Sequence, residues 1–319
     1  MTATDPHLVV GEAVEDWTGD ARYFEYSRAA DPVGAGTTPK VSMRQFAPEL
    51  HQRAGTGVVQ LDLSAELATS WPATSPALLA SFVRVEAGES LETSAIATSQ
   101  LFHVISGSGS SRIGDRDLDW VRGDVIVVPL GQSILHHADS RAAMYWVTDE
   151  PLMRYLGVAP TEQRFETTLF PASRIRDELD LIENDRRARD RNRLSVLLAT
   201  APQTQTLTVT HVLWAMFGLL PVDAVQRPHR HQSVALDLIL DCEPGCYTLV
   251  GTTIDADGEI VDPTRIDWEP GGAFVTPPGL WHAHHNESGI PAHLLPVQDA
   301  GLHTHLRSLD IRFSPSRRH

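Results

Sequence analysis

Three histidines in the C-terminal half of the chain have the spacing of a metal site. His229 and His231 flank a single residue, and His282 follows a Pro-Pro-Gly turn further along the chain. Because side chains alternate along a β-strand, His229 and His231 are expected on one face, where they form two corners of the site. A His-x-His pair alone is also common on solvated strands, so the metal hypothesis depends on His282 as the third corner.

The residue type restricts both the metal and the kind of site. Imidazole ligands without cysteine suit Fe(II), Cu, Zn or Ni rather than Mg or Ca. Three protein ligands leave positions on the metal open for a substrate or O2, which is the arrangement of a catalytic site and not of a structural one.

Short β-strands at regular spacing precede this site. Apolar and polar residues alternate in the first of them, and a Gly-Asp pair marks a tight hairpin in a later one. The predicted strands cover residues 57–63, 78–85, 101–109, 111–117, 120–129 and 143–148. This pattern predicts a β-barrel or sandwich rather than an α/β fold. A second set of strands is expected from Leu207 onwards, with a hairpin loop at Asp255–Gly258.

One helix is expected between the two strand-rich regions. Ile175, Leu179 and Ile182 recur at helical spacing within residues 174–183, and Ser173 is the candidate N-cap. The arginine-rich run that follows, residues 184–193, predicts a solvated face or a belt of salt bridges between domains. The alternative is that it steers an anionic substrate.

Length and charge indicate the class of protein. The 319 residues leave room for two domains, and the net charge of -15 with a pI of about 5.4 fits an acidic, soluble enzyme. This balance argues against duplex nucleic acid or an anionic membrane as a partner. The polar N-terminus and the lack of a long apolar run predict a cytoplasmic protein.

The two cysteines flank a turn. Cys242 and Cys246 stand in D-C-E-P-G-C, which brings them to opposite sides of a hairpin. A disulfide, a redox pair and two idle thiols are all compatible with this spacing, and idle thiols are favoured.

Two motifs make the chain resemble the cupin superfamily. Cupins carry H-x-H on one strand and P-x-G-x-x-H-x-x-x-N on a later one, and Pro277, Gly279, His282 and Asn286 match the second motif at each position. The glutamate that usually follows the first motif is absent, since alanine and leucine stand in its place. This loss, with R-P-H-R-H and T-P-P-x-x-W-H-x-H-x-N, resembles the gentisate 1,2-dioxygenase group of bicupins. Those enzymes hold Fe(II) with three histidines and cleave aromatic rings.

The resemblance implies an all-β fold of two cupin barrels (double-stranded β-helices, or jelly rolls) joined by a helical linker. The expected divisions are an N-terminal arm over residues 1–55, a first barrel over 56–158, the linker over 159–200 and a metal-binding barrel over 201–319. The arm is expected to be irregular and to pack on a neighbouring subunit, and the family implies a homo-oligomer. Gentisate enzymes usually carry iron in the first half, whereas the intact ligands here lie in the second.

The first half resembles the non-metal half of the same bicupins through F-H-V-I-S-G-S-G and D-W-x-x-G-D-x-x-V-V-P. Its residues at the ligand positions cannot replace imidazole, so this barrel is expected to be metal-free and structural. His103, His136 and His137 lie nearby but are not expected to form a replacement site. The positions aligned with the lost ligands are Ser94, Ile96, Gln100 and Ile134.

For the second barrel, the resemblance implies Fe(II) on His229, His231 and His282, with Ni, Cu, Zn and Mn as alternatives. His284 is expected to move protons, as imidazole does near neutral pH. The implied function is an extradiol-type ring-cleaving dioxygenase that inserts O2 into a small, chelating hydroxy- or aminoaromatic substrate. The alternatives are another metal-dependent cupin oxygenase acting on a different chelating substrate, and a non-catalytic bicupin that binds a metal or a small molecule.

Asp237 departs from the family pattern and is the second candidate catalytic residue. Gentisate-type enzymes carry arginine at this position, in A-L-R, where it helps to hold the substrate carboxylate. A buried carboxylate repels a second one, so gentisate is expected to be a poor substrate and a neutral or amine-bearing ring to be favoured. The alternative is that Asp237 pairs with Arg227 or Arg265.

Overall fold

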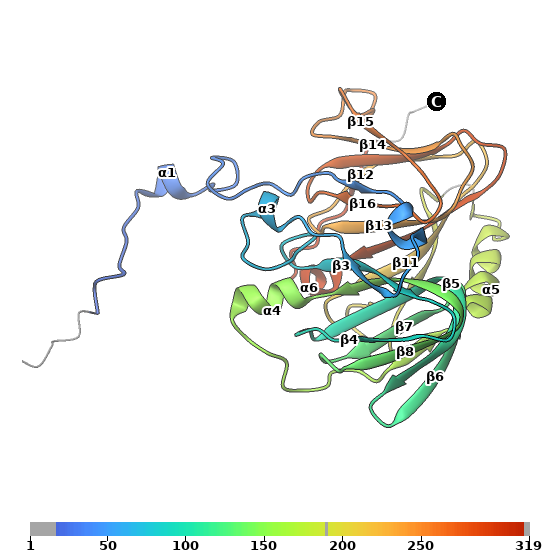
Figure 1. The fold of residues 1–319 in the computed structure, drawn as a ribbon. Helices are drawn as coiled ribbons and strands as arrows, with labels where there is room; N and C mark the ends of the chain where they lie inside the picture. Colours follow the sequence, from blue (N-terminus) through green and yellow to red (C-terminus); the bar gives the residue numbers. More distant parts are fainter. Residues whose placement is uncertain (1–16, 189–190, 316–319) are drawn as a thin grey trace, which may run out of the picture. The chain divides into compact units, whose positions relative to one another are not determined.

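The computed structural model describes residues 17–188 and 191–315, and the chain divides into two units, Met1–Lys40 and Val41–His319. The described part of the first unit contains one short helix, α1 (Tyr26–Ala29), whose N-terminus is capped by the carboxylate of Glu25. All strands of the described residues belong to the second unit (Figure 1). No helix among the described residues is long and apolar enough to cross a membrane.

An antiparallel sheet of eight strands curls into the first barrel, drawn from blue to yellow-green in Figure 1. Strands β5 and β8 are each 15 residues long and pair along most of their length, with register shifts that bend β5. Aromatic and aliphatic side chains, including Phe102 and Trp146, fill the interior. The strands are β2 (Gly57–Gln60), β3 (Leu79–Val85), β4 (Ser90–Thr93), β5 (Ser99–Ile113), β6 (Arg116–Val121), β7 (Val125–Pro129), β8 (Ile134–Thr148) and β9 (Thr168–Phe170).

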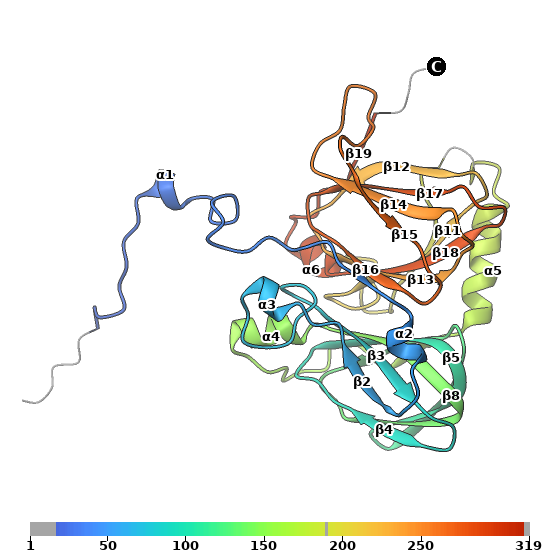
Figure 2. The ribbon, with the colours of Figure 1, turned by 45° about the horizontal axis from the view of Figure 1, so that its top comes forward.

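Two antiparallel sheets form the second barrel. The six-stranded sheet has the order β1 (Gln45–Phe46), β16 (Ala273–Thr276), β13 (Ala235–Asp241), β18 (Ala292–Gln298), β11 (Trp214–Leu220) and β10 (Leu194–Leu198). The five-stranded sheet has the order β15 (Thr264–Asp267), β14 (Cys246–Gly251), β17 (Trp281–Asn286), β12 (Val225–Arg230) and β19 (Arg312–Phe313). The two barrels and the helix between them confirm the predicted all-β fold (Figure 2).

Five further helices connect the strands in the described part of the chain, and the longest of them, α5, lies along the side of the barrels (Figures 1 and 2). Its apolar stripe packs as predicted, since Leu179 contacts Leu194 and Leu219 of the second barrel. Its start differs from the prediction. The carboxylate of Asp124 accepts a hydrogen bond from the backbone N–H of Ala172, so the cap comes from the first barrel and not from Ser173. The helices are α2 (Glu49–Gln52), α3 (Ser64–Leu67), α4 (Glu150–Leu156), α5 (Ala172–Glu183) and α6 (Ala300–His305).

One apolar cluster belongs to both barrels. Phe82 and Tyr145 of the first barrel and Leu236 and Leu238 of the second are buried in the same cluster. Leu236 and Leu238 therefore face the first barrel. The interface between the barrels is a continuation of their cores.

Two predicted segments differ from the structure. Residues 207–213 are irregular, because Thr210 Oγ1 accepts the backbone N–H groups of Val212 and Leu213 and so competes with sheet pairing. The strand that precedes this irregular segment in the second barrel is β10, which lies within the segment predicted as linker.

Of the predicted N-terminal arm, residues 1–16 lie outside the described residues, as do residues 189–190 of the linker. Residues 45–46 form β1, which pairs with β16 of the second barrel. The predicted boundaries between arm, barrels and linker stay predictions.

Candidate metal centre

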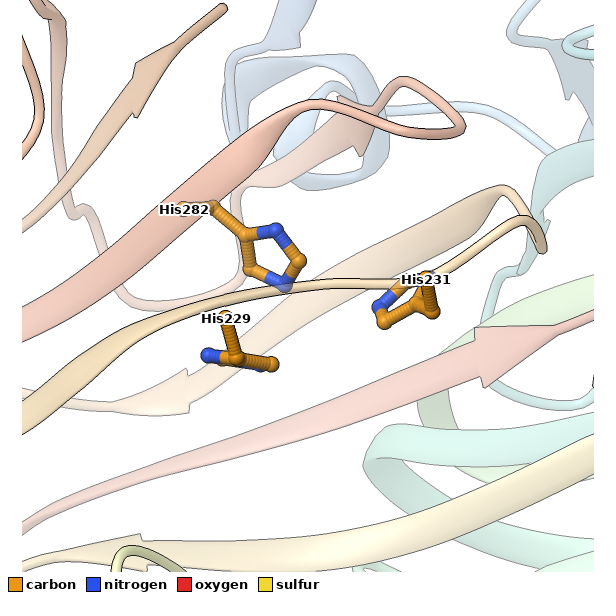
Figure 3. A group of neighbouring side chains, drawn as sticks. All are labelled: His229, His231 and His282. Atoms are coloured by element: carbon orange, nitrogen blue, oxygen red, sulfur yellow. The ribbon is translucent and has the colours of Figure 1, made fainter. Parts of the chain in front are cut away.

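His229, His231 and His282 converge inside the second barrel. Their ligand nitrogens all lie within 4.8 Å of one another, and each residue is at most 3% exposed. The rings turn towards a common point, with His229 and His231 on one chain segment and His282 on another (Figure 3). The structure thus brings together the three histidines that the spacing singled out.

Backbone carbonyls fix which nitrogen of each ring faces this point. The Nδ1 atoms of His229, His231 and His282 lie 3.2, 2.9 and 3.1 Å from the carbonyl oxygens of Arg227, Ser233 and Leu280. A carbonyl only accepts, so each Nδ1 carries the proton and donates, and each Nε2 keeps its lone pair. Such bonds orient metal-binding imidazoles. The three histidines therefore present three Nε2 lone pairs.

A bulge in β12 positions His229. In the ladder with β17, Gln226 faces His284 and His229 faces His282, with a register shift between the two pairs. Residues three apart on a regular strand point to opposite faces, and the bulge brings both to the interior. Pro228, which has no N–H for the ladder, lies within this bulge.

His231 differs from the prediction, because β12 ends at Arg230 and His231 follows it outside the ladder. Two local contacts hold it instead. The carbonyl oxygen of Ser233 lies next to His231 Nδ1. The carbonyl oxygen of His231 accepts the backbone N–H of Gly279 at 2.7 Å. Gly279 has a φ of +77°, in the region that favours glycine. The Pro-Pro-Gly turn that leads to His282 thus also fixes His231.

Burial keeps these imidazoles neutral. It lowers the pKa of His231 to about 4, against the opposing effect of the Ser233 carbonyl. Burial, reinforced by neighbouring imidazoles, holds the pKa of His229 and His282 well below the usual value. A ligand histidine must be neutral, so this electrostatic environment suits metal binding.

His284 lies beside these three rings but carries its proton on the other nitrogen. Its ring centroid is 5.8 Å from that of His282, and its Nδ1 is 2.8 Å from Thr248 Oγ1. The Thr248 hydroxyl also accepts the Trp268 Nε1–H, so the proton of this hydroxyl is donated to His284 Nδ1, its one acceptor among the described residues. The Nε2 of His284 therefore carries a proton towards the barrel interior.

Asp237 is also buried in this barrel, but not with the predicted partners. Arg227 bonds to the Ser314 carbonyl and Arg265 to Asp267, so neither pairs with Asp237. Thr276 Oγ1 donates to Asp237 Oδ2 at 2.7 Å. Burial raises the pKa of Asp237 to about 6, opposed by the Thr276 hydrogen bond and by the positive charge of Arg193.

Arg193 is the site residue that the sequence reasoning missed. It belongs to the arginine-rich run predicted as a solvated face or salt-bridge belt, yet its Nη2 lies 3.2 Å from His229 Nε2. The signal in the sequence is its position directly before the apolar strand Leu194–Leu198, where the chain enters the barrel.

The first barrel repeats the surroundings of His284 without the three ligands. His136 Nδ1 is 2.7 Å from Ser111 Oγ, which also accepts the Trp120 Nε1–H. The other ring nitrogen of His136 is 3.0 Å from the hydroxyl of Thr93. Hydroxyl groups thus occupy both nitrogens of this imidazole.

The register corrects the alignment of the first barrel by one residue. Thr93 faces Ile134 as His229 faces His282, so the lost His-x-His positions are Thr93 and Ala95, not Ser94 and Ile96. The shift does not restore a ligand set.

Two further sequence features have structural roles. Cys242 and Cys246 are both buried free thiols, which is the state that their spacing in the sequence was expected to favour. Cys246 Sγ donates to Asn286 Oδ1. The Asn286 amide nitrogen donates to the carbonyls of Leu220 and Ile290, which ties down the end of β17.

We compared the chain with known protein families, protein sequences and solved structures. No protein-family model matches the chain. A stretch of 62 residues, 19% of this chain and 17% of the other, is 40% identical to a 5-aminosalicylate 1,2-dioxygenase from a Comamonas species. The match therefore spans less than a fifth of that enzyme's length.

The similar solved structures span both barrels, over 82% to 97% of the chain. Salicylate 1,2-dioxygenase from Pseudaminobacter salicylatoxidans has a TM-score of 0.70 at 12% identity, over 97% of this chain and 99% of the other. Its adduct with gentisate gives 0.68 at 12% identity, over 91% and 90%. A cupin 2 conserved barrel domain protein from Leptotrichia buccalis gives 0.50 at 13% identity, over 82% and 98%. The chain has the cupin fold, as the resemblance implied.

Proposed function

We propose that this chain is a mononuclear non-haem Fe(II) dioxygenase that inserts O2 into a small, chelating hydroxy- or aminoaromatic substrate and cleaves its ring in the extradiol manner. The observation that carries the proposal is the convergence of three neutral imidazoles whose Nδ1 atoms are all tied to backbone carbonyls. The similar dioxygenases support it, because salicylate and 5-aminosalicylate both carry a hydroxyl beside a carboxylate.

The residues fit a first-row metal ion. His231 Nε2 is buried and has no hydrogen-bond partner, which is costly for a polar atom unless a ligand completes it. Three imidazoles suit Fe(II), with Ni, Cu, Zn and Mn as alternatives, and leave coordination positions for other groups. The residues that would hold the ion are His229, His231 and His282.

Bound iron would supply the chelation of the substrate and the electron transfer to O2. The chain supplies the rest. The three carbonyl-tethered histidines hold their rings in one orientation, so little rearrangement is needed on binding. The surrounding barrel buries the site, and the low dielectric constant strengthens each electrostatic interaction within it.

His284 is the proposed proton-transfer residue. Its Nε2–H points inward while Thr248 holds Nδ1, so the ring can give a proton to a substrate oxygen at Nε2 and recover it there. Asp237 is proposed to contact the substrate on the wall of the same barrel interior, where its carboxylate accepts a hydrogen bond from a hydroxyl or amine group.

The test begins with metal binding and oxygen uptake. Metal-free protein is loaded with Fe(II) under anaerobic conditions, and O2 consumption is then measured with salicylate, 5-aminosalicylate, gentisate and 2-aminophenol. We expect one iron per chain and uptake with at least one of these compounds. His229→Ala and His282→Ala are expected to weaken iron binding by at least about 100-fold.

His137→Ala, at an exposed position of the first barrel, is the matched control and is expected to bind iron normally. Iron binding that survives alanine at all three histidines would exclude the proposed metal centre. Tight iron binding without uptake on any aromatic compound would instead identify a non-catalytic metal-binding bicupin.

A further inference from the structure

A cavity of about 500 Å³ lies where helix α5 crosses the edge of the interface between the barrels. Its walls come from β5 and the turn between β6 and β7 in the first barrel, from β11 and β13 in the second, and from α5. A second cavity of about 320 Å³ adjoins it, because Ile105, Arg122 and Leu240 line both. Cavities of this size hold small organic ligands.

The six-stranded sheet separates this α5 cavity from the three histidines. The histidines lie inside the second barrel, where Asp237 of β13 is also buried. Side chains alternate along a strand, so Leu238 and Leu240 of β13 point the other way, towards the first barrel and the cavity. None of the three histidines lines the α5 cavity. A molecule bound there would therefore be a second ligand, distinct from one at the histidine site.

Backbone geometry shapes the first barrel's wall of the α5 cavity. The ladder between β5 and β8 shifts register between Val104 and Ser106, and such a bulge bends the strand. Gly123, in the turn before β7, has a φ of +92°, and a Cβ there would lie 2.8 Å from the Cβ of Ala172 at the start of α5. The strand bends away at the cavity while the helix begins close against the barrel beside it.

The inner wall of the α5 cavity is apolar. Phe217 and Leu238 of the second barrel line it from one side, and Ile175 and Leu179 of α5 line it from another. All four side chains are buried. Such a wall favours the apolar body of a ligand, because burial there removes hydrocarbon surface from water.

His103 is the buried polar residue of this wall. It is 4% exposed, and its ring packs edge-on against Phe217 with 5.6 Å between the centroids. Burial lowers the pKa of His103 to about 3, opposed by the Asp124 carbonyl and assisted by the positive charge of Arg122, so the ring is neutral. Its Nδ1 is buried, and no described residue completes a hydrogen bond to it. A buried polar atom of this kind is costly unless a ligand or water satisfies it.

Two exposed arginines, Arg122 and Arg176, line the outer edge of the α5 cavity. Neither has a carboxylate oxygen within 4 Å among the described residues, whereas Arg174 on the same helix pairs with Glu178. The acids of this edge are Asp180 and Asp241, and Asp241 already accepts a hydrogen bond from His293 Nδ1 at 2.6 Å. The two guanidinium groups thus keep their N–H donors for a bound anion.

We propose that the α5 cavity is a second binding site and that it takes a small amphipathic carboxylate. The apolar body of the ligand packs between Phe217, Leu238 and α5, and its carboxylate binds Arg122 and Arg176 at the outer edge. This inference does not depend on the proposed metal centre. Because the ligand contacts both barrels and α5, its binding stabilises the folded arrangement of the three.

The experiment compares a charged probe with a neutral one of the same shape. Metal-free protein is titrated with 1-naphthoate and with 1-naphthamide, and isothermal calorimetry gives each dissociation constant. The metal-free state ensures that no metal ion holds the carboxylate. For the wild-type protein we expect 1-naphthoate to bind about tenfold more tightly than 1-naphthamide, since two partly exposed ion pairs supply this difference.

The variants separate the charged edge from the apolar wall. Arg122→Gln and Arg176→Gln are each expected to weaken 1-naphthoate binding by about threefold, and together to abolish its advantage over 1-naphthamide. Ile105→Trp places a larger side chain in the space that the two cavities share, and it is expected to prevent binding of both probes. Arg116→Gln, at an exposed position of β6 outside the cavity, is the control and is expected to bind both probes as wild type does.

Three results would overturn the proposal. The first is equal affinity for the two probes, or binding of neither, in the wild-type protein. The second is wild-type affinity for 1-naphthoate in the double arginine variant. The third is wild-type affinity in a folded Ile105→Trp, which would place the ligand outside the α5 cavity. The exposed arginine variants allow the decision should Ile105→Trp fail to fold, as judged by circular dichroism.

Discussion

At the scale of single residues, hydrogen-bond partners divide four neighbouring imidazoles into two kinds. Carbonyl oxygens hold the proton of His229, His231 and His282 on Nδ1, whereas a hydroxyl at Thr248 leaves the proton of His284 on Nε2. The first three therefore present lone pairs and the fourth presents a proton. The hydrogen-bond partner of each Nδ1 atom thus decides whether the histidine presents a lone pair or a proton at Nε2.

Removing the hydroxyl behind His284 tests this division. Thr248→Val deletes the group that holds Nδ1, so the imidazole proton no longer stays on Nε2. We expect kcat for O2 uptake to fall by about 10- to 100-fold with unchanged iron affinity. Thr248→Ser keeps the hydroxyl and is expected to retain most of the activity. A parallel loss of iron binding in Thr248→Val would contradict the separation of the two roles.

His136 of the first barrel gives a pH-dependent prediction. Burial lowers its pKa to about 4, below the usual value of 6.5 in the unfolded chain. The unfolded state therefore binds more protons, and the stability due to the neutral imidazole is present above pH 6.5 and lost as the pH falls towards 4.

His136→Gln abolishes this loss. The difference in unfolding free energy between wild type and variant is expected to shrink by about 2 kcal/mol from pH 7 to pH 5. Urea denaturation at the two pH values measures this difference, with His137→Gln, at an exposed position of the same strand, as the control. An unchanged difference would mean that His136 is protonated in the folded barrel.

At the scale of strands and helices, local patterns predicted most elements of the fold. Alternation located β2, and a Gly-Asp pair located the hairpin between β5 and β6. The start of α5 was missed because its cap, Asp124, is remote in sequence. The strand expected from Leu207 was wrong because threonine side chains bond to the local backbone there.

The candidate site shows the same limit. The three histidines were found from their spacing, but the reason given for His231 was incomplete, since β12 ends before it and a turn contact holds it. Arg193 was missed because only the tertiary structure separates it from its solvated neighbours in the arginine run. Residue type and spacing identify candidate ligands, whereas long-range packing decides which charge reaches them.

The Pro-Pro-Gly turn between β16 and β17 yields an element-scale prediction. A Cβ at Gly279 meets no atom within 4 Å, so Gly279→Ala is strained only by its φ of +77°. We expect a loss of about 1–2 kcal/mol in unfolding free energy and weaker iron binding, because the Gly279 N–H holds the His231 carbonyl. Gly289→Ala, with equal space and no positive φ, is the control. Equal effects of the two substitutions would refute this account.

At the scale of the whole second unit, the shared apolar cluster joins the stability of the two barrels. Leu236, 1% exposed in the second barrel, packs in the cluster that contains Phe82 and Tyr145 of the first. Barrels that share a core are expected to unfold together, because separating them exposes apolar surface on both.

Leu236→Ala is expected to destabilise both barrels by about 2–5 kcal/mol in a single transition. Urea unfolding followed by tryptophan fluorescence and by circular dichroism is expected to give coincident midpoints. Leu135→Ala, at a position that is 46% exposed, is expected to change little. Two separate transitions in Leu236→Ala would show that the barrels fold independently.

The two barrels share one buried hydrogen-bonded arrangement. A hydroxyl group accepts a tryptophan N–H and contacts a histidine ring in each, through Trp120, Ser111 and His136 in the first barrel and Trp268, Thr248 and His284 in the second. Duplication of one ancestral domain would produce two halves that share such buried detail, and among the described residues the three clustered histidines belong to the second half. The first barrel contributes Phe82 and Tyr145 to the core that it shares with the second, so its fold supports the barrel that carries the three histidines. After such a duplication, the second barrel carries the candidate metal site and the first barrel contributes packing.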